Sequence, residues 1–325
     1  MRRFFCAAAL LAMCGGMPAA AQAPFPEPGR PITVIVPYPP GGGSDITARM
    51  LAPELERALG APVVIVNRAG AGSQIGMTEL TRARPDGHTI AYGLWPSTFT
   101  LYLDPSRRTP FNRDSFAPLA MHVIDPGAIL VPAASPIQSF ADLVAAARAR
   151  PGAISMADPG MLGWEHISSL QLQKALGIEF NQVHFPGTAP VITALAGRQI
   201  DVTMASGGTA VIQSRAGVVR VLAVLSDRPN DSLPGVPTLA SLGVPLSAGS
   251  ARGFVAPAGT PEPVVRRLAE ALERAITSPS HREQLQRIGL DISFMGPAEF
   301  DSYWTREENA MRPVITEIVR QGTNN

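Results

Sequence analysis

Cysteine is almost absent from this sequence, and both copies lie close to its start. The chain has 325 residues, and its cysteines are Cys6 and Cys14. The residues after position 23 can therefore form no disulfide and offer no thiolate for catalysis or metal binding. A chain without such cross-links depends on large hydrophobic cores, and about 300 residues are enough for two domains.

Long apolar runs and basic runs are also missing after position 23. No later segment is long and apolar enough to predict a membrane-spanning helix. The sequence has 27 Lys and Arg against 26 Asp and Glu, so loss of Arg2 and Arg3 would change the formal charge from +1 to −1. This balance argues against nucleic acid as a partner. There is no internal repeat and no low-complexity linker.

Signatures of catalysis and cofactor binding are missing too. The chain has no G-x-S-x-G elbow, and His88, His122 and His281 are scattered without a spacing typical of zinc sites. The glycines at 41–43 are not followed by Lys and Ser or Thr, and they do not form G-x-G-x-x-G. We therefore expect no catalytic residue, no cofactor and no metal.

The first 23 residues have the pattern of a secretory signal peptide. Arg2 and Arg3 precede an apolar core at 4–13 that is too short for a stable membrane span. Residues 21–23 read Ala-Gln-Ala, which is an A-x-A cleavage pattern, so we expect the mature chain to begin at Pro24. Lipidation at Cys14 is the less favoured alternative, because Met13 is a poor residue before a lipidated cysteine.

One segment near the start of the mature chain has the pattern of an anion site. A β-branched strand at 32–36 ends at prolines, glycines follow at 41–43, and Ser44 or Asp45 is expected to cap a helix toward Leu59. Free N–H groups and the positive end of the helix dipole at such a turn favour an anion. An ordinary strand-to-helix turn without a ligand is the alternative.

Short apolar runs alternate with helical patterns along the rest of the chain. Strands are predicted at 63–66, 89–92, 129–131, 154–156, 182–184, 201–204, 219–225 and 252–256. Helices are predicted at 140–150, 164–176, 191–196, 264–276 and 299–320, with Ser139 as an N-cap. This alternation predicts βαβ units and an α/β fold with mostly parallel sheets.

Several segments together resemble the periplasmic solute-binding proteins of the tripartite tricarboxylate transporter system, the Bug family. They are P-I-T-V-I-V-P-Y-P-P-G-G-G-S-D at 31–45, P-V-V-I-V-N-R-A-G-A-G at 62–72, I-G at 75–76, P-D-G-H-T at 85–89, P-G-V-P-T at 234–238 and A-P-A-G-T-P at 256–261. The resemblance covers essentially the whole mature chain. It implies a two-domain, type II-like periplasmic-binding-protein fold, with each sheet flanked by helices and a ligand cleft between the domains.

The resemblance also implies that the chain crosses twice between the domains. The crossings are expected near 121–125 and 226–228, which gives a first domain of 24–124 plus 227–325 and a second domain of 125–226. Each piece has an ordinary domain size. Two crossings favour hinge closure around a ligand.

In the first domain, ligand contacts are expected in the glycine loop, which the resemblance implies, and in the segment after the strand at 89–92, where Trp95 stands in place of the small residues usual in the family. The residues are Tyr38, Pro40, Gly41, Gly42, Gly43, Ser44, Asp45, Trp95 and Ser97. Asp45 is interpreted as a cap and loop organiser, or alternatively as a ligand partner that holds a water. The first role is favoured, because carboxylates are common at helix starts.

In the second domain, the expected contacts lie in three loops. The residues are Gly160, Met161, Trp164, His166, Thr188, Ser206 and Thr209, with glycines 207 and 208 expected to leave room for the ligand. Around Gly160 and His166, four residues depart from the small polar pattern of the family: Met161, Leu162, Trp164 and Glu165. These departures argue against a dicarboxylate. They favour a less polar or aromatic monocarboxylate, or a ligand with a cationic group near Asp158 or Glu165.

The two tryptophans leave two interpretations open. Trp95 and Trp164 could hold an aromatic ligand in the cleft, or both could pack in the domain cores. For Trp95 the cleft is slightly favoured, because it is expected directly after the carboxyl end of a strand.

The function that the resemblance implies is transport. We expect a monomeric periplasmic receptor that binds a small organic acid and delivers it to the permease of a tripartite tricarboxylate transporter. The first alternative is a periplasmic sensor that signals to a membrane kinase. The second is an enzyme that uses the same cleft, which the missing nucleophile–base and metal patterns disfavour.

Overall fold

The computed structural model describes residues 25–322. The predicted signal peptide, with Cys6, Cys14 and the expected cleavage site after Ala23, lies outside these residues. Within them, no helix combines the length and the apolar character that crossing a membrane requires.

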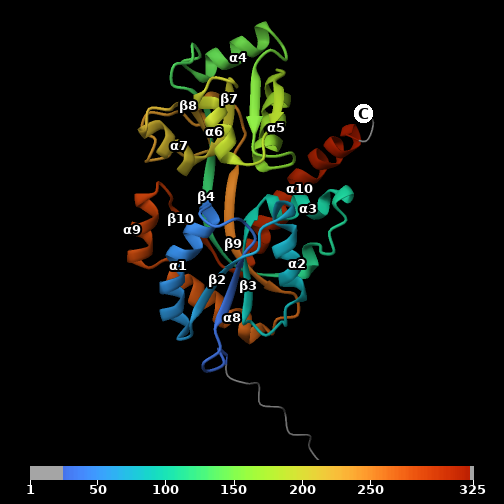
Figure 1. Ribbon diagram of the computed structural model, residues 1–325, viewed down its shortest axis with the longest axis vertical. Coiled ribbons are helices and arrows are strands. Elements are labelled where there is room, and N and C mark those ends of the chain that lie inside the picture. The colour runs from blue at the N-terminus through green and yellow to red at the C-terminus, as the bar shows by residue number, and fades with distance from the viewer. Residues whose placement is uncertain (1–24, 323–325) are drawn as a thin grey trace, which may run out of the picture.

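Two lobes stand one above the other in Figure 1, joined by the long strands β4 and β9. In the lower lobe, β1 pairs in parallel with β2 and β3. The strands of this lobe are β1 (Ile32–Val36), β2 (Val63–Asn67), β3 (Thr89–Trp95) and β10 (Ile292–Met295). Its helices are α1 (Gly43–Leu59), α2 (Gln74–Arg82), α3 (Ser97–Leu103), α8 (Glu262–Ile276), α9 (Pro279–Arg287) and α10 (Pro297–Gly322).

The upper lobe repeats the parallel arrangement. Strand β5 pairs in parallel with β6 and β7. The strands are β5 (Ser155–Asp158), β6 (Asn181–His184), β7 (Val202–Ser206) and β8 (Val219–Leu225). The helices are α4 (Phe140–Ala149), α5 (Trp164–Leu176), α6 (Thr188–Ala196) and α7 (Gly207–Arg215). The α/β fold class is thereby confirmed, with one parallel block in each lobe.

Two antiparallel strands connect these blocks. Strand β4 (Phe116–Pro132) belongs to both sheets, and β9 (Gly249–Pro257) pairs with it from Phe116 to Pro126. The sheet order is β2-β1-β3-β9-β4-β7-β5-β6, with β8 and β10 also paired to β4. Because β9 and β4 carry the chain from lobe to lobe, side chains at their middle face both lobes.

Helices cover each sheet on both faces. Leu51 and Leu55 of α1 pack with Leu268 and Leu272 of α8 on one face of the lower sheet. On the opposite face, α10 packs its aromatic residues with β3 and α3. Figure 1 shows the end of α10 reaching toward the upper lobe, where Gln171 of α5 contacts Met311 with its amide nitrogen 3.8 Å from the sulfur.

The segment between β8 and β9 packs with the upper lobe. Leu239 and Val244 lie in the same hydrophobic cluster as Ile129, and Leu233 lies in the other upper cluster. Leu239 N–H also donates to the carbonyl oxygen of Val224 in β8 at 2.8 Å. We therefore propose that the second domain boundary lies near Gly249, later than the position 227 expected from the sequence.

The structure adds elements that the sequence patterns did not predict. These are α2, α3, α7, α9 and β10, together with the first half of β4. Pro118 and Pro126 interrupt the pattern of β4 but lie within the strand. The predicted cap of α4 is confirmed, because the Ser139 side chain accepts from Asp142 N–H and the Asp142 carboxylate accepts from Ser139 N–H.

Candidate functional site

The glycine loop precedes α1, and Gly42 is its N-cap residue. The prediction that Ser44 or Asp45 is the N-cap residue of this helix is therefore wrong. Asp45 instead organises the loop, because its carboxylate accepts from Gly41 N–H at 2.9 Å, Arg49 Nε at 2.8 Å and Asn67 Nδ2 at 2.9 Å. Burial raises the pKa of Asp45, but these hydrogen bonds outweigh burial and hold the pKa below its usual range.

The loop presents backbone at the surface of the lower lobe. Pro40, Gly41, Gly42 and Gly43 are exposed, whereas Ser44 is buried. Gly41 has a φ of 79°, which a residue with a side chain rarely adopts. The first N–H groups of α1 have no acceptor within the helix, so an anion placed here would receive hydrogen bonds and the favourable end of the dipole.

Tyr38 stands at the base of this loop. Its ring packs against the lower core, and its hydroxyl is buried without a hydrogen-bond partner among the described residues. Burial raises the pKa of this phenol to about 12. The prediction that Tyr38 contacts the ligand remains a prediction, since its hydroxyl is turned into the protein.

A buried arginine lies beside the start of α1. Arg252 of β9 is 5% exposed, and a Cβ placed on Gly43 would come within 3.0 Å of its Nη2 atom. Sequence reasoning missed this residue. The signal was a single Arg within the otherwise apolar run 251–257, which indicates a charge held inside a strand.

An acidic residue on the other crossing strand faces Arg252. Asp125 of β4 is 2% exposed, and its Oδ2 atom lies 3.6 Å from Arg252 Nη2. Its Oδ1 atom accepts from Gly208 N–H at 3.2 Å, at the start of α7. Burial raises the pKa of Asp125, and the neighbouring guanidinium opposes that shift.

Asp125 also explains the two glycines at the start of α7. A Cβ on Gly207 would lie 2.9 Å from Asp125 Oδ1 and 2.9 Å from Pro126 O. Gly207 therefore leaves room for this carboxylate, and the expectation that glycines 207 and 208 leave room for the ligand remains a prediction. Ser206 is the N-cap of α7, and its Oγ lies 3.1 Å from Thr209 Oγ1.

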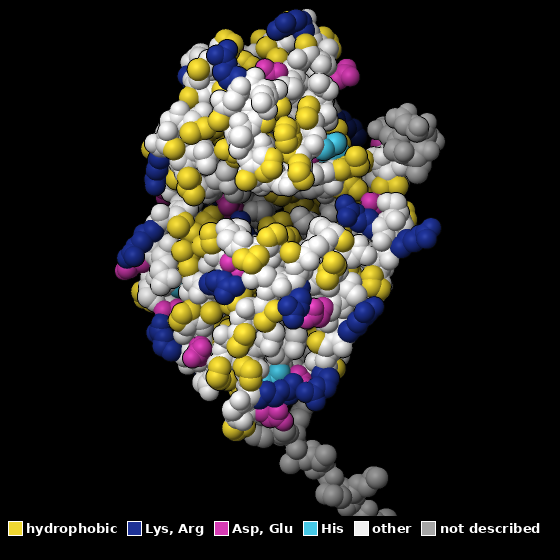
Figure 2. Space-filling view, in the orientation of Figure 1, with side chains coloured by type: hydrophobic (Ala, Val, Ile, Leu, Met, Phe, Trp, Pro, Cys, Tyr) yellow, Lys and Arg dark blue, Asp and Glu magenta, His cyan; other side chains and the backbone are white. Residues whose placement is uncertain are grey.

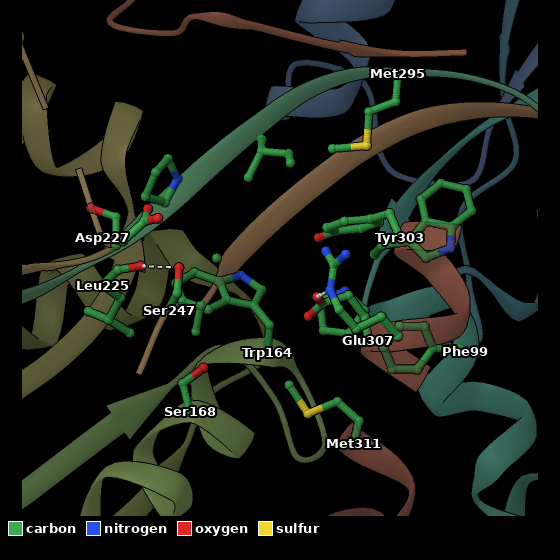
Figure 3. A pocket seen from close by; sticks show the side chains of 18 residues that line it. Phe99, Trp164, Ser168, Leu225, Asp227, Ser247, Met295, Tyr303, Glu307 and Met311 are labelled. Atoms are coloured by element: carbon green, nitrogen blue, oxygen red, sulfur yellow. Dashed lines mark hydrogen bonds and ion pairs between the residues drawn. The ribbon is translucent and has the colours of Figure 1, made fainter. Parts of the chain in front are cut away.

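A cavity of about 410 Å³ lies between the lobes on the opposite face of the crossing strands. Figure 2 shows the hollow between the lobes, and Figure 3 shows the side chains that line the cavity. They come from both lobes and from the connection, and include Trp95, Phe99, Trp164, Ser168, Asp227, Ser247, Met295, Tyr303, Arg306, Glu307 and Met311. The wall from α10 was not predicted as part of the site.

Trp95 and Trp164 both line this cavity and both belong to hydrophobic cores. Trp95 is 1% exposed, and its ring centre lies 4.9 Å from those of Phe300 and Trp304. Trp164 is 4% exposed and lies against Gly127 of β4, where a Cβ would come within 2.5 Å of the indole. Trp95 is the last residue of β3, because this strand continues three residues past the predicted end at Tyr92. Each tryptophan therefore lines the cavity and also packs in a hydrophobic core, so the two interpretations from the sequence do not exclude each other.

The ends of β5 and β6 and the first turn of α5 bring together a cluster that is not visible in the sequence spacing. Ligand atoms of Asp158, His166 and His184 lie within 4.8 Å of one another. His184 Nδ1 lies 2.9 Å from both Asp158 oxygens, and Leu162 N–H donates to His166 Nδ1 at 3.1 Å. That bond leaves the proton of neutral His166 on Nε2, which is the atom a metal would need free. The cluster is therefore better suited to a hydrogen-bond network than to a metal site.

The acids of this loop do not offer free negative charge to a ligand. Burial raises the pKa of Glu165 to about 8, so the carboxyl is mostly neutral at pH 7. Asp158 is buried and accepts from Gly160 N–H at 2.9 Å as well as from His184. The alternative of a cationic group near these residues therefore finds no support in the geometry.

The other predicted contacts are spread around the lobes. Met161 is 58% exposed at the tip of its loop, and Thr188 is exposed at the start of α6. Ser97 is partly buried at the start of α3. Of the sixteen predicted contacts, only Trp95 and Trp164 line the cavity, whereas Gly43 adjoins Arg252 on the other face of the crossing strands.

Two lobes, two crossing strands and a space between them define a two-lobed solute-binding protein. The chain belongs to the tripartite tricarboxylate transporter receptor family, whose model matches residues 47–319. A protein from the tcbD–tcbE intergenic region of Pseudomonas sp. strain P51 is 32% identical over 293 residues, which cover 89% of this chain and 87% of that protein. BugT of Bordetella pertussis is 29% identical over 292 residues, or 89% of this chain and 90% of BugT.

Solved structures agree with this family. MatC from Rhodopseudomonas palustris, solved with bound malate, is 27% identical and superimposes with a TM-score of 0.76 over 89% of this chain and 99% of MatC. An R. palustris protein solved with adipate is 26% identical, with a TM-score of 0.80 over 90% of this chain and 98% of its own. This chain is therefore a solute-binding receptor of a family whose structural neighbours are periplasmic binding proteins.

Proposed function

We propose that this receptor captures a small organic acid whose carboxylate binds beside the glycine loop and the start of α1. The observation that carries the proposal is the combination of exposed loop backbone at 40–43 with the buried Arg252 guanidinium beside Gly43. Both supply hydrogen-bond donors and positive potential to one point. An anion is the ligand chemistry that satisfies both.

The rest of the ligand is proposed to be apolar or aromatic. Trp95 pairs with Ala251 of β9, next to Arg252, so the cavity begins one residue away from the guanidinium. Successive residues of a strand point to opposite faces of the sheet. A ligand that contacts both the Arg252 guanidinium and the Trp95 indole must therefore pass around the edge of β9, where β9 extends beyond the end of β3. A flat body there would contact the indoles of Trp95 and Trp164, which favours an aromatic or less polar monocarboxylate over a dicarboxylate.

The proposed output is delivery to a membrane permease of the tripartite tricarboxylate type. The receptor would act as a monomer in the periplasm after removal of the signal peptide, and a ligand that bridges the lobes would favour closure about β4 and β9. The similar proteins solved with malate and adipate support organic acids as the ligand class. The proposal includes no catalytic step.

The test is a thermal-shift screen of refolded, ligand-stripped protein that begins at Pro24. The panel contains benzoate, phenylacetate, hexanoate, malate and adipate, each with its neutral amide as a matched control. A ligand present at a hundred times its dissociation constant adds about 2.7 kcal/mol to the unfolding free energy, which a melting curve resolves.

Stabilisation by aromatic acids but not by malate or adipate supports the proposed ligand class. Stabilisation by malate or adipate alone contradicts that class and leaves the organic-acid receptor intact. If no acid stabilises the protein more than its amide does, the proposed function is wrong.

A further inference from the structure

Four polar side chains inside the lower lobe form one hydrogen-bonded chain. They are Thr47 of α1, Tyr92 of β3, His122 of β4 and His281 of α9, and each is fully buried. The Tyr92 hydroxyl lies 3.1 Å from Thr47 Oγ1 and 2.6 Å from His122 Nδ1. His122 Nε2 lies 2.7 Å from His281 Nε2. None of the four lines the cavity between the lobes, so ligand contact does not explain this buried chain.

The buried chain joins a crossing strand to the start of α1. The register of β4 with β9 shifts between Met121 and Val123, so His122 is an extra residue without a partner on β9. Such a β-bulge re-aims a side chain. At the other end of the chain, Thr47 Oγ1 donates to Gly43 O at 2.8 Å, in the first turn of α1. The bulge of β4 is therefore tied to the helix start that follows the glycine loop.

Both imidazoles of the buried chain are neutral at pH 7. Burial, together with His281 and Arg252, lowers the pKa of His122. Burial also lowers the pKa of His281 to about 4, although the Glu54 carboxylate opposes this shift. A neutral imidazole has one N–H and one bare nitrogen. Because the two Nε2 atoms are hydrogen-bonded to each other, one of them carries the shared proton, and its position fixes the tautomers of both rings.

The partners at the ends of the chain favour one direction. In this direction, His281 Nε2–H donates to His122 Nε2, and His122 Nδ1–H donates to the Tyr92 hydroxyl. The hydroxyl then donates to Thr47, whose own proton remains for Gly43 O, so every proton has an acceptor. The reverse direction places a proton on His281 Nδ1, a buried atom without a partner among the described residues. A buried donor without an acceptor is costly, which disfavours the reverse direction.

We propose that the buried chain runs from His281 to Gly43 O and positions the first turn of α1 against β4, with His122 held as the Nδ1–H tautomer. Thr47 and His122 are then positioning residues, because they fix the backbone at the start of α1 without touching a ligand. Their effect on binding rests on the proposed function, which places a carboxylate beside this helix start. The direction of the chain does not depend on any ligand.

The first test determines both tautomers in the protein that begins at Pro24. Long-range ¹⁵N–¹H correlation spectra at pH 7 distinguish a protonated imidazole nitrogen from a bare one, and correlation with its own backbone assigns each ring. We expect His122 to be protonated at Nδ1 and His281 at Nε2. Protonation of His122 at Nε2, or at both nitrogens, overturns the proposal.

A change at Thr47 tests whether α1 sets the direction of the chain. In T47V the Tyr92 hydroxyl loses its acceptor, so each direction leaves one donor unbonded, and both tautomers of His122 should be populated. T47S keeps the hydroxyl and should keep the wild-type tautomer. T100V is the matched control, because the buried Thr100 hydroxyl of α3 donates to Ser97 O at 2.9 Å but lies outside the chain. If T47V keeps the wild-type tautomer, the proposal is wrong.

Two further readouts measure the positioning of the helix start. Ile46 N–H donates to Gly42 O at 2.9 Å, and its hydrogen exchange should be faster in T47V than in T47S or T100V. Acetate is the smallest probe with a carboxylate, and T47V should bind it about 2- to 10-fold more weakly than the wild type, the equivalent of one hydrogen bond. T47S and T100V should bind acetate as the wild type does. Equal exchange at Ile46 in all three variants overturns the positioning role.

The outcomes separate this inference from the proposed function. If the wild type binds acetate no better than its neutral control acetamide, the proposed carboxylate site is wrong, whereas the tautomers and the exchange at Ile46 still decide on the chain. If acetate binds and the tautomer of His122 is reversed, the proposed function stands and this inference fails. If T47V binds acetate with wild-type affinity, the chain does not position the ligand site.

Discussion

The starts of α1 and α7 are built alike and are used differently. Each follows the carboxyl end of a parallel strand and begins with glycine, Gly43 in α1 and Gly207 in α7. At α7 the anion position is taken by Asp125, which belongs to the protein itself. At α1 the Asp45 carboxylate accepts from Gly41 N–H in the loop, no carboxylate of the described residues accepts from Gly43 N–H, and the Arg252 guanidinium lies beside Gly43.

This difference shows that a glycine-rich helix start does not by itself identify a ligand site. The dipole and the free N–H groups are the same at both helices, because they follow from the backbone. What differs is the side chain that the crossing strands bring to each helix. One helix receives an acid, and its N–H groups are satisfied within the protein. The other receives a base and is left with an excess of donors.

The largest expected effect is that of D125A. The substitution empties the anion position of α7 and removes the charge that faces Arg252, so the unfolding free energy should fall by about 3 to 5 kcal/mol. Urea denaturation measures this change. Formate should restore more stability to D125A than it adds to the wild type, because the variant has two vacant anion positions.

D125N serves as the control for D125A. The amide keeps an acceptor for Gly208 N–H but loses the charge, so its stability should lie between those of D125A and the wild type. If D125A unfolds at the wild-type urea concentration, the Asp125 carboxylate does not hold the start of α7, and the contrast with α1 is wrong.

A matched pair of glycine substitutions distinguishes the two helices next. In G207A the new Cβ meets Asp125 Oδ1 and Pro126 O at 2.9 Å, and one of these is backbone, so stability should fall by about 1 to 3 kcal/mol. In G43A the Cβ meets only the end of Arg252, at 3.0 Å. We expect less than about 1 kcal/mol of destabilisation there, but weaker acetate binding.

The readouts for this pair are calorimetric unfolding and acetate titration. The comparison fails if G43A destabilises the protein as much as G207A, or if G207A alone impairs the binding of acetate.

A third helix start, that of α5, should respond to pH. Burial raises the pKa of Glu165 from 4.5 to about 8. The neutral Glu165 carboxyl contributes fully to stability below pH 4.5, and this contribution is lost as the pH rises to 8. The reason is that Glu165 ionises at a lower pH in the unfolded chain than in the folded protein. This residue should therefore lower the unfolding free energy by about 1.4 kcal/mol per pH unit in that window.

E165Q should remove this slope. E299Q is the control, because Glu299 is an exposed acid in the first turn of α10. Denaturant unfolding at pH 6 and pH 7 measures the difference between wild type and variant, and equal pH slopes in wild type and E165Q would contradict the raised pKa.

The smallest effect is expected at the cavity. W164F should weaken benzoate about fivefold, the equivalent of about 1 kcal/mol for one aromatic contact, and leave acetate unchanged. W304F is the control, because Trp304 is fully buried beside Trp95 and does not line the cavity. Isothermal titration with both acids tests this. An equal loss for benzoate and acetate would show that Trp164 only supports the fold.

The regular parts of this fold were predictable because their patterns are local. Strand β1, helix α5 and strand β8 were predicted with the bounds that the structure has, and the cap at Ser139 follows from side chains within one turn. Periodicity also located α8 and α10 to within a few residues. Strand β4 was underestimated, because Pro118 and Pro126 resemble breaks, whereas neighbouring strands hold them in register.

The candidate site was predictable only where it consists of backbone. The glycine loop was identified, since glycine and proline restrict the chain without help from distant residues. Arg252 was missed, because a single Arg in a strand gives no sign of its partners. The contact of Gly207 and Gly208 with a carboxylate was missed for a related reason. The carboxylate that they accommodate comes from Asp125, which lies far earlier in the chain.

By itself, the sequence determined the α/β class, the family and a glycine-started helix that can receive an anion. These follow from periodicity, from motif residues and from backbone geometry, all of which act over short distances along the chain. Only the tertiary structure decided that the Asp125 carboxylate lies at the start of α7 and that the buried Arg252 guanidinium lies beside the start of α1. It also decided that Trp95 and Trp164 line one cavity. Such pairings join residues 69 to 209 positions apart, and they exist only when the crossing strands β4 and β9 bring the lobes together.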